Sequence, residues 1–336
     1  MREPPANLSG ETLRAYLRTH YGLTVAEITF LPLGHDASAW VYRARTAGGA
    51  YFLKVRTRVD NEPGLLVPRY LHDHGVARVV APRPTGAGAL WATAGGYALI
   101  LYPFIAGTTG MERGMSARQW IDYGALLRQI HEITLSPDLA RLMRRESFAP
   151  AEADVVRDLD VRVGARTVDD PLEDALAAFW QERREDIRTL LRRTESLGRQ
   201  LAQAAPALVL CHADIHTNNV LLDEGGRVWI VDWDETVLAP RERDLMFVTG
   251  GGISSEFVGP RDEELFFQGY GAVSVDPLAL TYYRYAWAVS DIGAYAAQVF
   301  SRPDLGLSER REAVERFMSL FRPGNIIALA FASDEQ

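Results

Sequence analysis

The alternation of hydrophobic and polar positions predicts a β-rich first third of the chain that opens with one helix. Leu13 and Leu17 recur at helical spacing within residues 9–20, which predicts a helix there. Gly48 and Gly49 are typical of a hairpin turn between two strands. The pattern predicts strands over 28–34, 39–46, 50–56, 89–93 and 97–104, and a further helix over 65–74.

Beyond Gly107 the hydrophobic period changes to that of helices. Ser116 and Gln119 form a capping-box pattern, which predicts a helix over 116–133. Asp170 and Pro171 are typical of the start of a second long helix. Short strands are predicted between 208 and 234, and residues 262–322 are again helical in pattern. A β-rich amino-terminal lobe followed by a mainly helical lobe with a β insert predicts an α+β fold.

Composition narrows the class of protein. The chain has 336 residues, of which 47% are hydrophobic, so roughly two domains with a sizeable core are expected. The 36 basic and 44 acidic residues give a net charge of −8, which disfavours nucleic acid as a partner. The single cysteine, Cys211, excludes an intramolecular disulfide and a cysteine-based zinc site. The apolar runs are too short for a signal peptide or a membrane span, so we expect a soluble cytoplasmic chain.

The chemistry-bearing residues are concentrated between 208 and 235. A strand leads into His212 and Asp214, Asn219 follows five residues after Asp214, and a hairpin ends in Asp232 and Asp234. Phosphoryl transfer needs a carboxylate that accepts a hydroxyl proton, together with an amide oxygen and a second carboxylate that hold Mg²⁺. The alternative is an ordinary polar turn between two core strands.

This pattern resembles the catalytic loop and the metal-binding segment of the aminoglycoside phosphotransferases, which share the protein-kinase-like fold. Residues 212–219 match the motif H-x-D-x-x-x-x-N, and Asp232 matches the D-F-G aspartate, here as D-x-D. The resemblance implies that Asp214 is the catalytic base, that Asn219 and Asp232 bind Mg²⁺, and that His212 supports the loop. It also implies a bilobal fold with a nucleotide cleft between residues 1–104 and 105–336, and a hinge near 102–106.

The upstream half of the chain agrees with this resemblance. Lys54 lies late in a predicted strand, as does the kinase lysine that contacts the α- and β-phosphates; an exposed strand lysine is the alternative. Glu62 is the favoured carboxylate partner of Lys54, although Pro63 disturbs the expected helix. The turn over 33–40 takes the place of the nucleotide-covering loop, in which Ser38 and backbone amides contact phosphate; a plain hairpin turn is the alternative.

The stretch over 101–105 corresponds to the hinge that faces the adenine. Tyr102, Phe104 and Ile105 are the expected contacts of the base, and buried core side chains are the alternative. ATP is the expected phosphoryl donor, with GTP as the other nucleotide that the sequence leaves open.

Within the family, the chain is most similar to the spectinomycin phosphotransferases. The segments that carry this similarity are FLKV, LYPFI, LLRQIHE, CHADIHTNNVL, IVDWDE, LAPRERDLMF and YYRYAWAVSDI. The resemblance implies O-phosphorylation of a cationic aminocyclitol antibiotic, and hence resistance. A site for two ammonium groups needs carboxylates and aromatic faces. The candidate contacts are Asp234, Glu235, Tyr283, Trp287 and Asp291, with a helix core as the alternative for the aromatic residues.

Three other hypotheses about the function stay open. The first is a small-molecule kinase of the same fold that acts on choline, homoserine or methylthioribose, because the catalytic loop does not separate these acceptors. The second is a nucleotide-binding pseudokinase, and the third is a helical interaction protein without catalysis. Asp244 is expected to anchor the loop rather than to contact a ligand. A monomer and a dimer are both compatible with the sequence.

Overall fold

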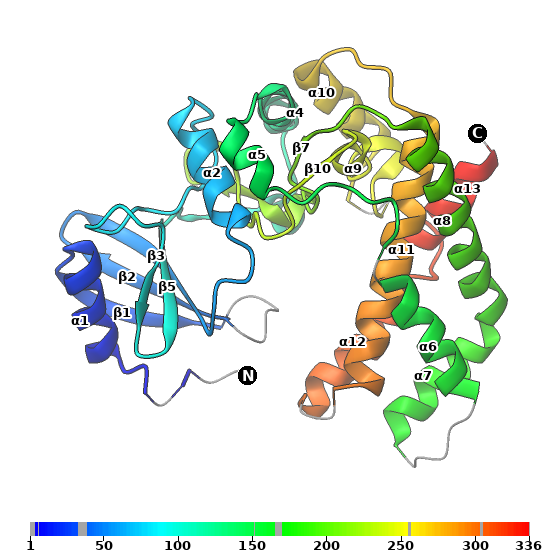
Figure 1. Ribbon diagram of the computed structural model, residues 1–336, viewed down its shortest axis with the longest axis horizontal. Coiled ribbons are helices and arrows are strands. Elements are labelled where there is room, and N and C mark those ends of the chain that lie inside the picture. Colours follow the sequence, from blue (N-terminus) through cyan, green and yellow to red (C-terminus); the bar gives the residue numbers. More distant parts are fainter. Residues whose placement is uncertain are drawn as a thin grey trace. The chain divides into compact units, whose positions relative to one another are not determined.

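The computed structural model describes residues 4–5, 7–32, 39–150, 152–164, 170–254, 257–302 and 305–335 (Figure 1). The chain forms two compact units, each assembled from separate segments. The first holds Met1–Met115, Ile133–Met143 and Thr217–Thr236. The second holds Ser116–Glu132, Arg144–His216 and Val237–Gln336. The units therefore differ from two contiguous lobes at 1–104 and 105–336, because later segments pair with early ones. The functional division into a nucleotide lobe and a catalytic lobe stays a prediction.

A five-stranded antiparallel sheet dominates the first unit. The strands lie in the order β1 (Val25–Leu31), β2 (Ala39–Thr46), β3 (Gly49–Arg56), β5 (Tyr97–Pro103) and β4 (Ala92–Ala94). Helix α1 (Gly10–Tyr21) packs on this sheet and buries Leu13 and Leu17 completely. Ser9 caps the start of α1, because its hydroxyl oxygen accepts a hydrogen bond from the Thr12 N–H. The expected helix and hairpin are thus confirmed to within three residues.

A smaller sheet completes the first unit. It pairs β6 (Gly107–Thr109) with β8 (Val220–Asp223), and β8 with β9 (Val228–Ile230). Gly107 is required at this junction, since a Cβ there would lie 2.1 Å from the Leu222 carbonyl oxygen. This pairing is why residues 217–236 belong to the first unit. Besides α1, the helices of the first unit are α2 (Pro63–Asp73), α3 (Gly110–Arg113), α5 (Pro137–Leu142) and the 3₁₀ turn η1 (Thr217–Asn219).

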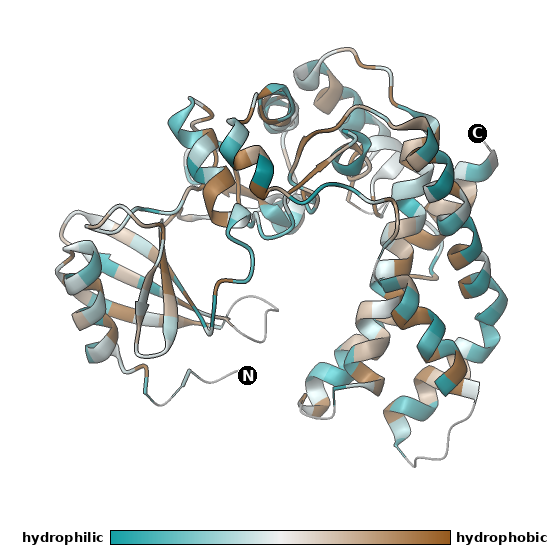
Figure 2. Cartoon of the chain, in the orientation of Figure 1, coloured by the Kyte–Doolittle hydropathy of each residue, from teal (hydrophilic) through white to brown (hydrophobic). Residues whose placement is uncertain are grey.

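The second unit is mainly helical. Its long helices are α4 (Ala117–Glu132), α6 (Glu152–Gly164), α7 (Pro171–Glu182), α8 (Arg184–Ala204), α10 (Pro260–Tyr270), α11 (Pro277–Phe300) and α12 (Leu307–Ser319). Its short elements are α9 (Glu242–Leu245), α13 (Ile326–Ala332), η2 (Thr249–Gly251), η3 (Ser333–Glu335), and the paired strands β7 (Val209–Cys211) and β10 (Val237–Ala239). Figure 2 shows hydrophobic residues along α11, which buries fourteen of its residues, and polar bands on α8.

The single long helix that the sequence predicts from Pro171 is two helices. The break falls at Arg183, whose φ of −103° and ψ of 9° leave the helical region. Beyond the break, Arg184 and Arg188 both bind the carboxylate of Asp160 on α6, which also accepts a hydrogen bond from the Trp180 indole. This shared carboxylate joins α6, α7 and α8. The hydrophobic periodicity of one segment cannot predict such a contact between helices. None of the described helices is long and apolar enough to span a membrane.

Candidate active site

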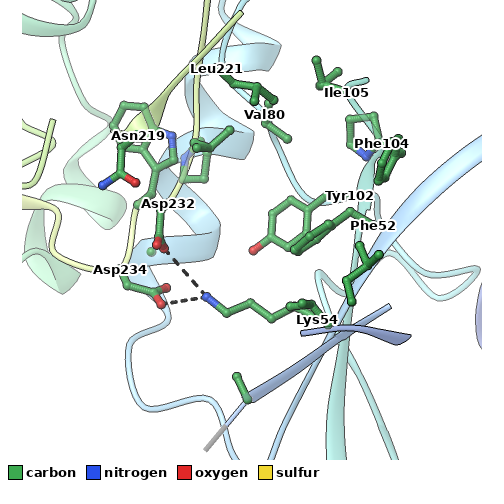
Figure 3. Close-up of a pocket in the computed structure, with 18 of the residues that line it drawn as sticks. Phe52, Lys54, Val80, Tyr102, Phe104, Ile105, Asn219, Leu221, Asp232 and Asp234 are labelled. Carbon is green, nitrogen blue, oxygen red and sulfur yellow. Dashed lines mark hydrogen bonds and ion pairs between the residues drawn. The ribbon is translucent and has the colours of Figure 1, made fainter. Parts of the chain in front are cut away.

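A cavity of about 480 Å³ lies in the first unit, where β3 and β5 approach the β8–β9 hairpin. Its walls are apolar and one end is charged (Figure 3). The apolar lining includes Val41, Phe52, Val80, Tyr102, Leu221 and Val231, and the polar lining is Lys54, Asn219, Asp232 and Asp234. A slot of this kind suits a ligand with a flat apolar part and an anionic part.

The apolar end contains the three residues that were expected at the hinge. Tyr102, Phe104 and Ile105 all line the cavity. The Tyr102 ring packs edge to face on Phe52 with their centroids 6.4 Å apart, and burial raises the pKa of its hydroxyl. The Phe104 N–H donates to the Ala50 carbonyl at 3.2 Å. The Phe104 amide is therefore occupied by β3, while the residue itself lines the cavity.

The charged end is organised around Lys54. Its Nζ lies 2.9 Å from Asp234 Oδ2 and 3.8 Å from Asp232 Oδ1 (Figure 3). Asp232 has a φ of 62°, in the left-handed region that costs free energy in a residue other than glycine. Its carboxylate is half exposed, whereas Lys54 is largely buried. Asp232 thus combines a strained backbone with a carboxylate that lines the cavity. Strained residues of this kind are often found at functional sites.

Glu62 is not the partner of Lys54, which corrects the sequence-based expectation. Helix α2 begins at Pro63, so Glu62 occupies its N-cap and is exposed. The first turn of α2 contains no acidic residue. The ion pairs of Lys54 go instead to Asp232 and Asp234, which come from the far end of the β8–β9 hairpin. Asp234, expected at the acceptor, is likewise bound to Lys54.

The oxygen donors at this end fit a magnesium ion. Asn219 is 7% exposed, and its backbone carbonyl accepts a hydrogen bond from the Val231 N–H at 3.1 Å. This bond holds Asn219 next to Val231, which immediately precedes Asp232. An amide oxygen and a carboxylate are hard ligands, which Mg²⁺ prefers over nitrogen or sulfur ligands. Asn219 and Asp232 both line the cavity, and each was predicted as a metal ligand.

The second unit carries Asp214, on the loop after β7. His212 is completely buried, and Asp244 Oδ2 accepts its backbone N–H at 2.8 Å. Asp244 Oδ2 also lies 3.0 Å from His131 Nε2, and His131 Nδ1 lies 2.7 Å from the Tyr270 hydroxyl. Burial opposes the negative charge of Asp244, but these hydrogen bonds hold its pKa below the usual range. Asp244 therefore anchors the loop.

The buried trio of His131, Cys211 and Asp244 has ligand types that could hold a metal, with all ligand atoms within 4.8 Å. Its groups are already used in hydrogen bonds. The Cys211 thiol donates to the carbonyls of Ala239 and Pro240, and burial raises its pKa, which opposes the thiolate that a metal requires. The trio is therefore a hydrogen-bond network.

The Asp214 carboxylate has a close histidine that sequence reasoning missed. His216 Nε2 lies 3.3 Å from Asp214 Oδ1, and both side chains are about one-quarter exposed or less. The Asp214 N–H donates to His212 Nδ1 at 3.3 Å, so the loop is bonded on both sides of the aspartate. The signal was present in the spacing H-x-D-x-H, in which alternate residues of the loop are His212, Asp214 and His216.

Asp291 and Trp287 come from one face of α11. Desolvation, followed by the negative charge of Asp214, raises the pKa of Asp291 to about 7, while a hydrogen bond from Trp287 opposes this shift. Trp287 packs edge to face on Phe247 with their centroids 5.0 Å apart, and the Arg243 guanidinium lies 5.3 Å from its ring centroid. This cluster combines carboxylates with aromatic faces.

The remaining candidate residues lie elsewhere. Tyr283 is 1% exposed and packs on Tyr282, so it is part of the helix core, as the alternative prediction for the aromatic residues had it. Glu235 is exposed and belongs to the first unit. Ser38 and most of the turn over 33–40 lie outside the described residues.

Comparisons with known proteins give a consistent result. Residues 29–283 match the model of the APH phosphotransferase enzyme family. The chain is similar to the crystal structure of spectinomycin phosphotransferase APH(9)-Ia in complex with ADP and spectinomycin, at 32% identity and a TM-score of 0.90, over 98% of this chain and 99% of that one. It is also similar to the AMP-bound complex of that protein, at 31% identity and a TM-score of 0.84, over 96% and 98% of the two chains.

A curated relative matches a shorter segment. The 3-deoxy-D-manno-octulosonic acid kinase of Xanthomonas axonopodis pv. citri (strain 306) is 36% identical over 82 residues. This alignment covers 20% of the present chain and 33% of the relative, so the chain spans about one-third of that relative's length.

Proposed function

The chain belongs to the APH phosphotransferase enzyme family, and from this premise we propose that it transfers the γ-phosphoryl group of ATP to a hydroxyl of an aminocyclitol, with spectinomycin as the favoured acceptor. The observation that carries the proposal is the near-complete likeness to a phosphotransferase crystallised with ADP and spectinomycin. A likeness over almost the whole of both chains includes the helical second unit, where acceptor specificity is expected to reside.

The cavity of the first unit supports the donor half of this proposal. The adenine lies against the rings of Phe52, Tyr102 and Phe104, and Lys54 contacts the phosphate groups. Asn219 and Asp232 would hold Mg²⁺ there. The metal supplies charge neutralisation at the phosphate oxygens. GTP is the alternative donor, and it shares the requirement for Lys54 because its triphosphate is the same.

The loop of the second unit supports the acceptor half. Asp214 orients the acceptor hydroxyl and takes its proton as the bond from the hydroxyl oxygen to the γ-phosphorus forms. The bond from the γ-phosphorus to the β,γ-bridging oxygen breaks, and ADP leaves with the electron pair. His216 holds the Asp214 carboxylate in one orientation through the 3.3 Å contact. Because the transition state is loose, positioning of the two oxygens contributes more than proton removal.

Asp291 and Trp287 are the proposed contacts of the cationic part of the acceptor. A carboxylate beside Asp214 attracts an ammonium group, and the indole face of Trp287 adds a cation–π contact. Spectinomycin carries two secondary ammonium groups and several hydroxyls, which fits this pair. A neutral or anionic sugar does not benefit from Asp291, which is the feature that favours an aminocyclitol over a sugar acid.

Two consequences follow from this function. Phosphorylation would inactivate the antibiotic, so the protein would confer resistance on its host. The use of ATP favours the cytoplasm as the place of the reaction.

The test is an ADP-release assay with ATP and Mg²⁺ against a panel of acceptors. The panel contains spectinomycin, streptomycin, a 2-deoxystreptamine aminoglycoside, choline, homoserine and methylthioribose. Turnover confined to spectinomycin is expected. Turnover with choline, homoserine or methylthioribose alone would replace the acceptor with that of the alternative kinases. Nucleotide binding without turnover on any acceptor would favour the pseudokinase.

A further inference from the structure

Two cations of one strand share a single carboxylate at the charged end of the cavity. Asp234 Oδ2 lies 2.9 Å from Lys54 Nζ and 3.2 Å from Arg56 Nη1. Lys54 and Arg56 are two residues apart in β3, so both side chains leave the same face of the sheet. Both are largely buried, and Asp234 is one-third exposed. Arg56 had no role in the sequence-based interpretation.

The backbone of Asp234 is also held in place. The Asn61 side-chain amide donates to the Asp234 carbonyl oxygen, just before α2. Gly64, in the first turn of α2, approaches the same segment so closely that a Cβ there would lie 3.1 Å from the Trp233 carbonyl oxygen. Trp233 itself is 2% exposed. The start of α2 therefore fixes the position of Asp234, although the helix supplies no carboxylate of its own to Lys54.

Four charges of the described residues form one network of ion pairs at this end of the cavity. Lys54 and Arg56 carry two positive charges, and Asp232 and Asp234 carry two negative ones. When Lys54 contacts a triphosphate, and Asp232 a metal ion, Asp234 loses one of its two cations. An unpaired carboxylate beside a polyphosphate would repel it, because two like charges at short range in a partly buried site raise the free energy.

We propose that Asp234 is the positioning partner of Lys54, and that Arg56 neutralises Asp234 when Lys54 contacts the nucleotide phosphates. Asp234 takes the part that a helix carboxylate was expected to play, and it is 180 residues from Lys54 in the sequence. Arg56 lets Lys54 leave without an uncompensated charge remaining in the cavity. This inference rests on the proposed function in one respect, namely that the ligand of the cavity is a nucleoside triphosphate.

The test measures binding of ATP and ADP by calorimetry, both with Mg²⁺ and with EDTA, so that it depends neither on the acceptor nor on the metal. Arg56→Met should weaken ATP binding about tenfold, because Asp234 then competes with the phosphates for Lys54. Arg56→Lys keeps the charge and should keep the affinity within about threefold. If Arg56→Met does not fold, Arg56→Gln replaces it, with thermal melting as the check.

The deciding variant combines Arg56→Met with Asp234→Asn. Removal of the carboxylate leaves Arg56 nothing to neutralise, so the double variant should bind ATP within about twofold of Asp234→Asn alone. Arg45→Met is the matched control, because Arg45 forms an exposed ion pair with Glu27 on the same sheet. It should leave ATP binding unchanged.

Each other outcome overturns the proposal in a distinguishable way. A loss of affinity in Arg56→Met that Asp234→Asn does not rescue would mean that Arg56 contacts the nucleotide directly. Unchanged affinity in Arg56→Met would mean that Asp234 needs no second cation. If the unaltered chain binds no nucleotide, the proposed function fails together with this inference, and that result is separate from the other two.

Discussion

The carboxylate of Asp244 holds the backbone of Ala213. Its Oδ1 accepts the Ala213 N–H at 2.6 Å. Ala213 has a φ of 69°, which costs a residue with a Cβ about 1–2 kcal/mol. The buried acceptor thus stabilises a strained conformation at the residue immediately before Asp214. This backbone conformation sets the direction in which the chain leaves β7. It thereby sets the position of the proposed catalytic carboxylate of Asp214.

Asp244→Ala should lower the free energy of unfolding by about 3–5 kcal/mol, because it leaves buried donors without their acceptor. Asp244→Asn should fold but lose most of its turnover, since its amide cannot accept all the hydrogen bonds of a carboxylate. Adding Ala213→Gly to Asp244→Asn should restore part of kcat by removing the strain. Asp154→Asn, an exposed aspartate on α6, is the control. Chemical denaturation and the ADP-release assay measure both effects, and wild-type turnover in Asp244→Asn would contradict this role.

Asp214→Asn should reduce kcat by about 10²–10⁴-fold and leave the affinity for ATP unchanged, because the variant lacks the proton acceptor but not the nucleotide cavity. Calorimetry with ATP and the ADP-release assay give the two quantities separately. His216→Gln should reduce kcat less, as it removes only the contact that orients Asp214. A variant at Asp214 with the turnover of the wild type would refute the assignment of this residue.

Lys54→Met and Glu62→Gln should differ sharply. Lys54 lies at the charged end of the cavity, so its loss should raise the KM for ATP and lower kcat, together about 10²-fold or more in kcat/KM. Glu62 is exposed at the N-cap of α2, so Glu62→Gln should leave both constants near those of the wild type. A large loss in Glu62→Gln would restore the helix carboxylate as the partner of Lys54.

What the sequence could predict is what lies within one short segment. Asp214 and Asn219 belong to one loop, and Asp232 follows one hairpin later, so a linear motif contains all three. The partner of Lys54 is not local. Glu62 was the favoured carboxylate among the residues between Lys54 and Asp73, whereas the partner is Asp234, which only the folded chain brings near.

The fold shows the same limit. Helix α1 and the hairpin of β2 and β3 carry their own capping and turn residues, so their bounds were predictable. The three-residue strand β10 is a strand only because it pairs with β7. Its residues carry no periodic signal long enough to recognise.

The pairing of α4 with α10 gives a prediction about stability. Gly124 lies so close to α10 that a Cβ there would be 2.0 Å from the Phe266 carbonyl oxygen. Gly124→Ala should therefore lower the free energy of unfolding by about 1–3 kcal/mol or more. The atom that the new Cβ would meet belongs to the backbone of α10, which moves aside less easily than a flexible side chain. Gly10→Ala is the control, since nothing lies within 4 Å of its Cβ. It should raise stability by about 0.4–1 kcal/mol. Equal denaturation midpoints for the two variants would contradict the close packing.

The raised pKa of Asp291 makes stability depend on pH. An aspartate of the unfolded chain ionises near its ordinary value of 3.8, whereas Asp291 keeps its proton up to about 7 in the folded state. The folded state therefore binds more protons between these values, and its stability falls as pH rises through this window. Asp291→Asn removes this pH dependence. The melting temperature of the variant minus that of the wild type should therefore increase from about pH 4 to about pH 7 and stay constant above about pH 7. Parallel melting curves across this range would contradict the shift.

The same proton affects binding of a cationic acceptor. An ammonium group attracts the ionised form of Asp291, so the KM for the acceptor should fall as pH rises through about 7. Acceptor binding should in turn lower the pKa of Asp291 and release a proton, which calorimetry in buffers of different ionisation enthalpy detects. In Asp291→Asn the KM for the acceptor should be higher and its proton release absent, while the KM for ATP stays unchanged. Proton release that persists in this variant would assign the titration to another group, with Asp214 and His216 as the neighbours to examine.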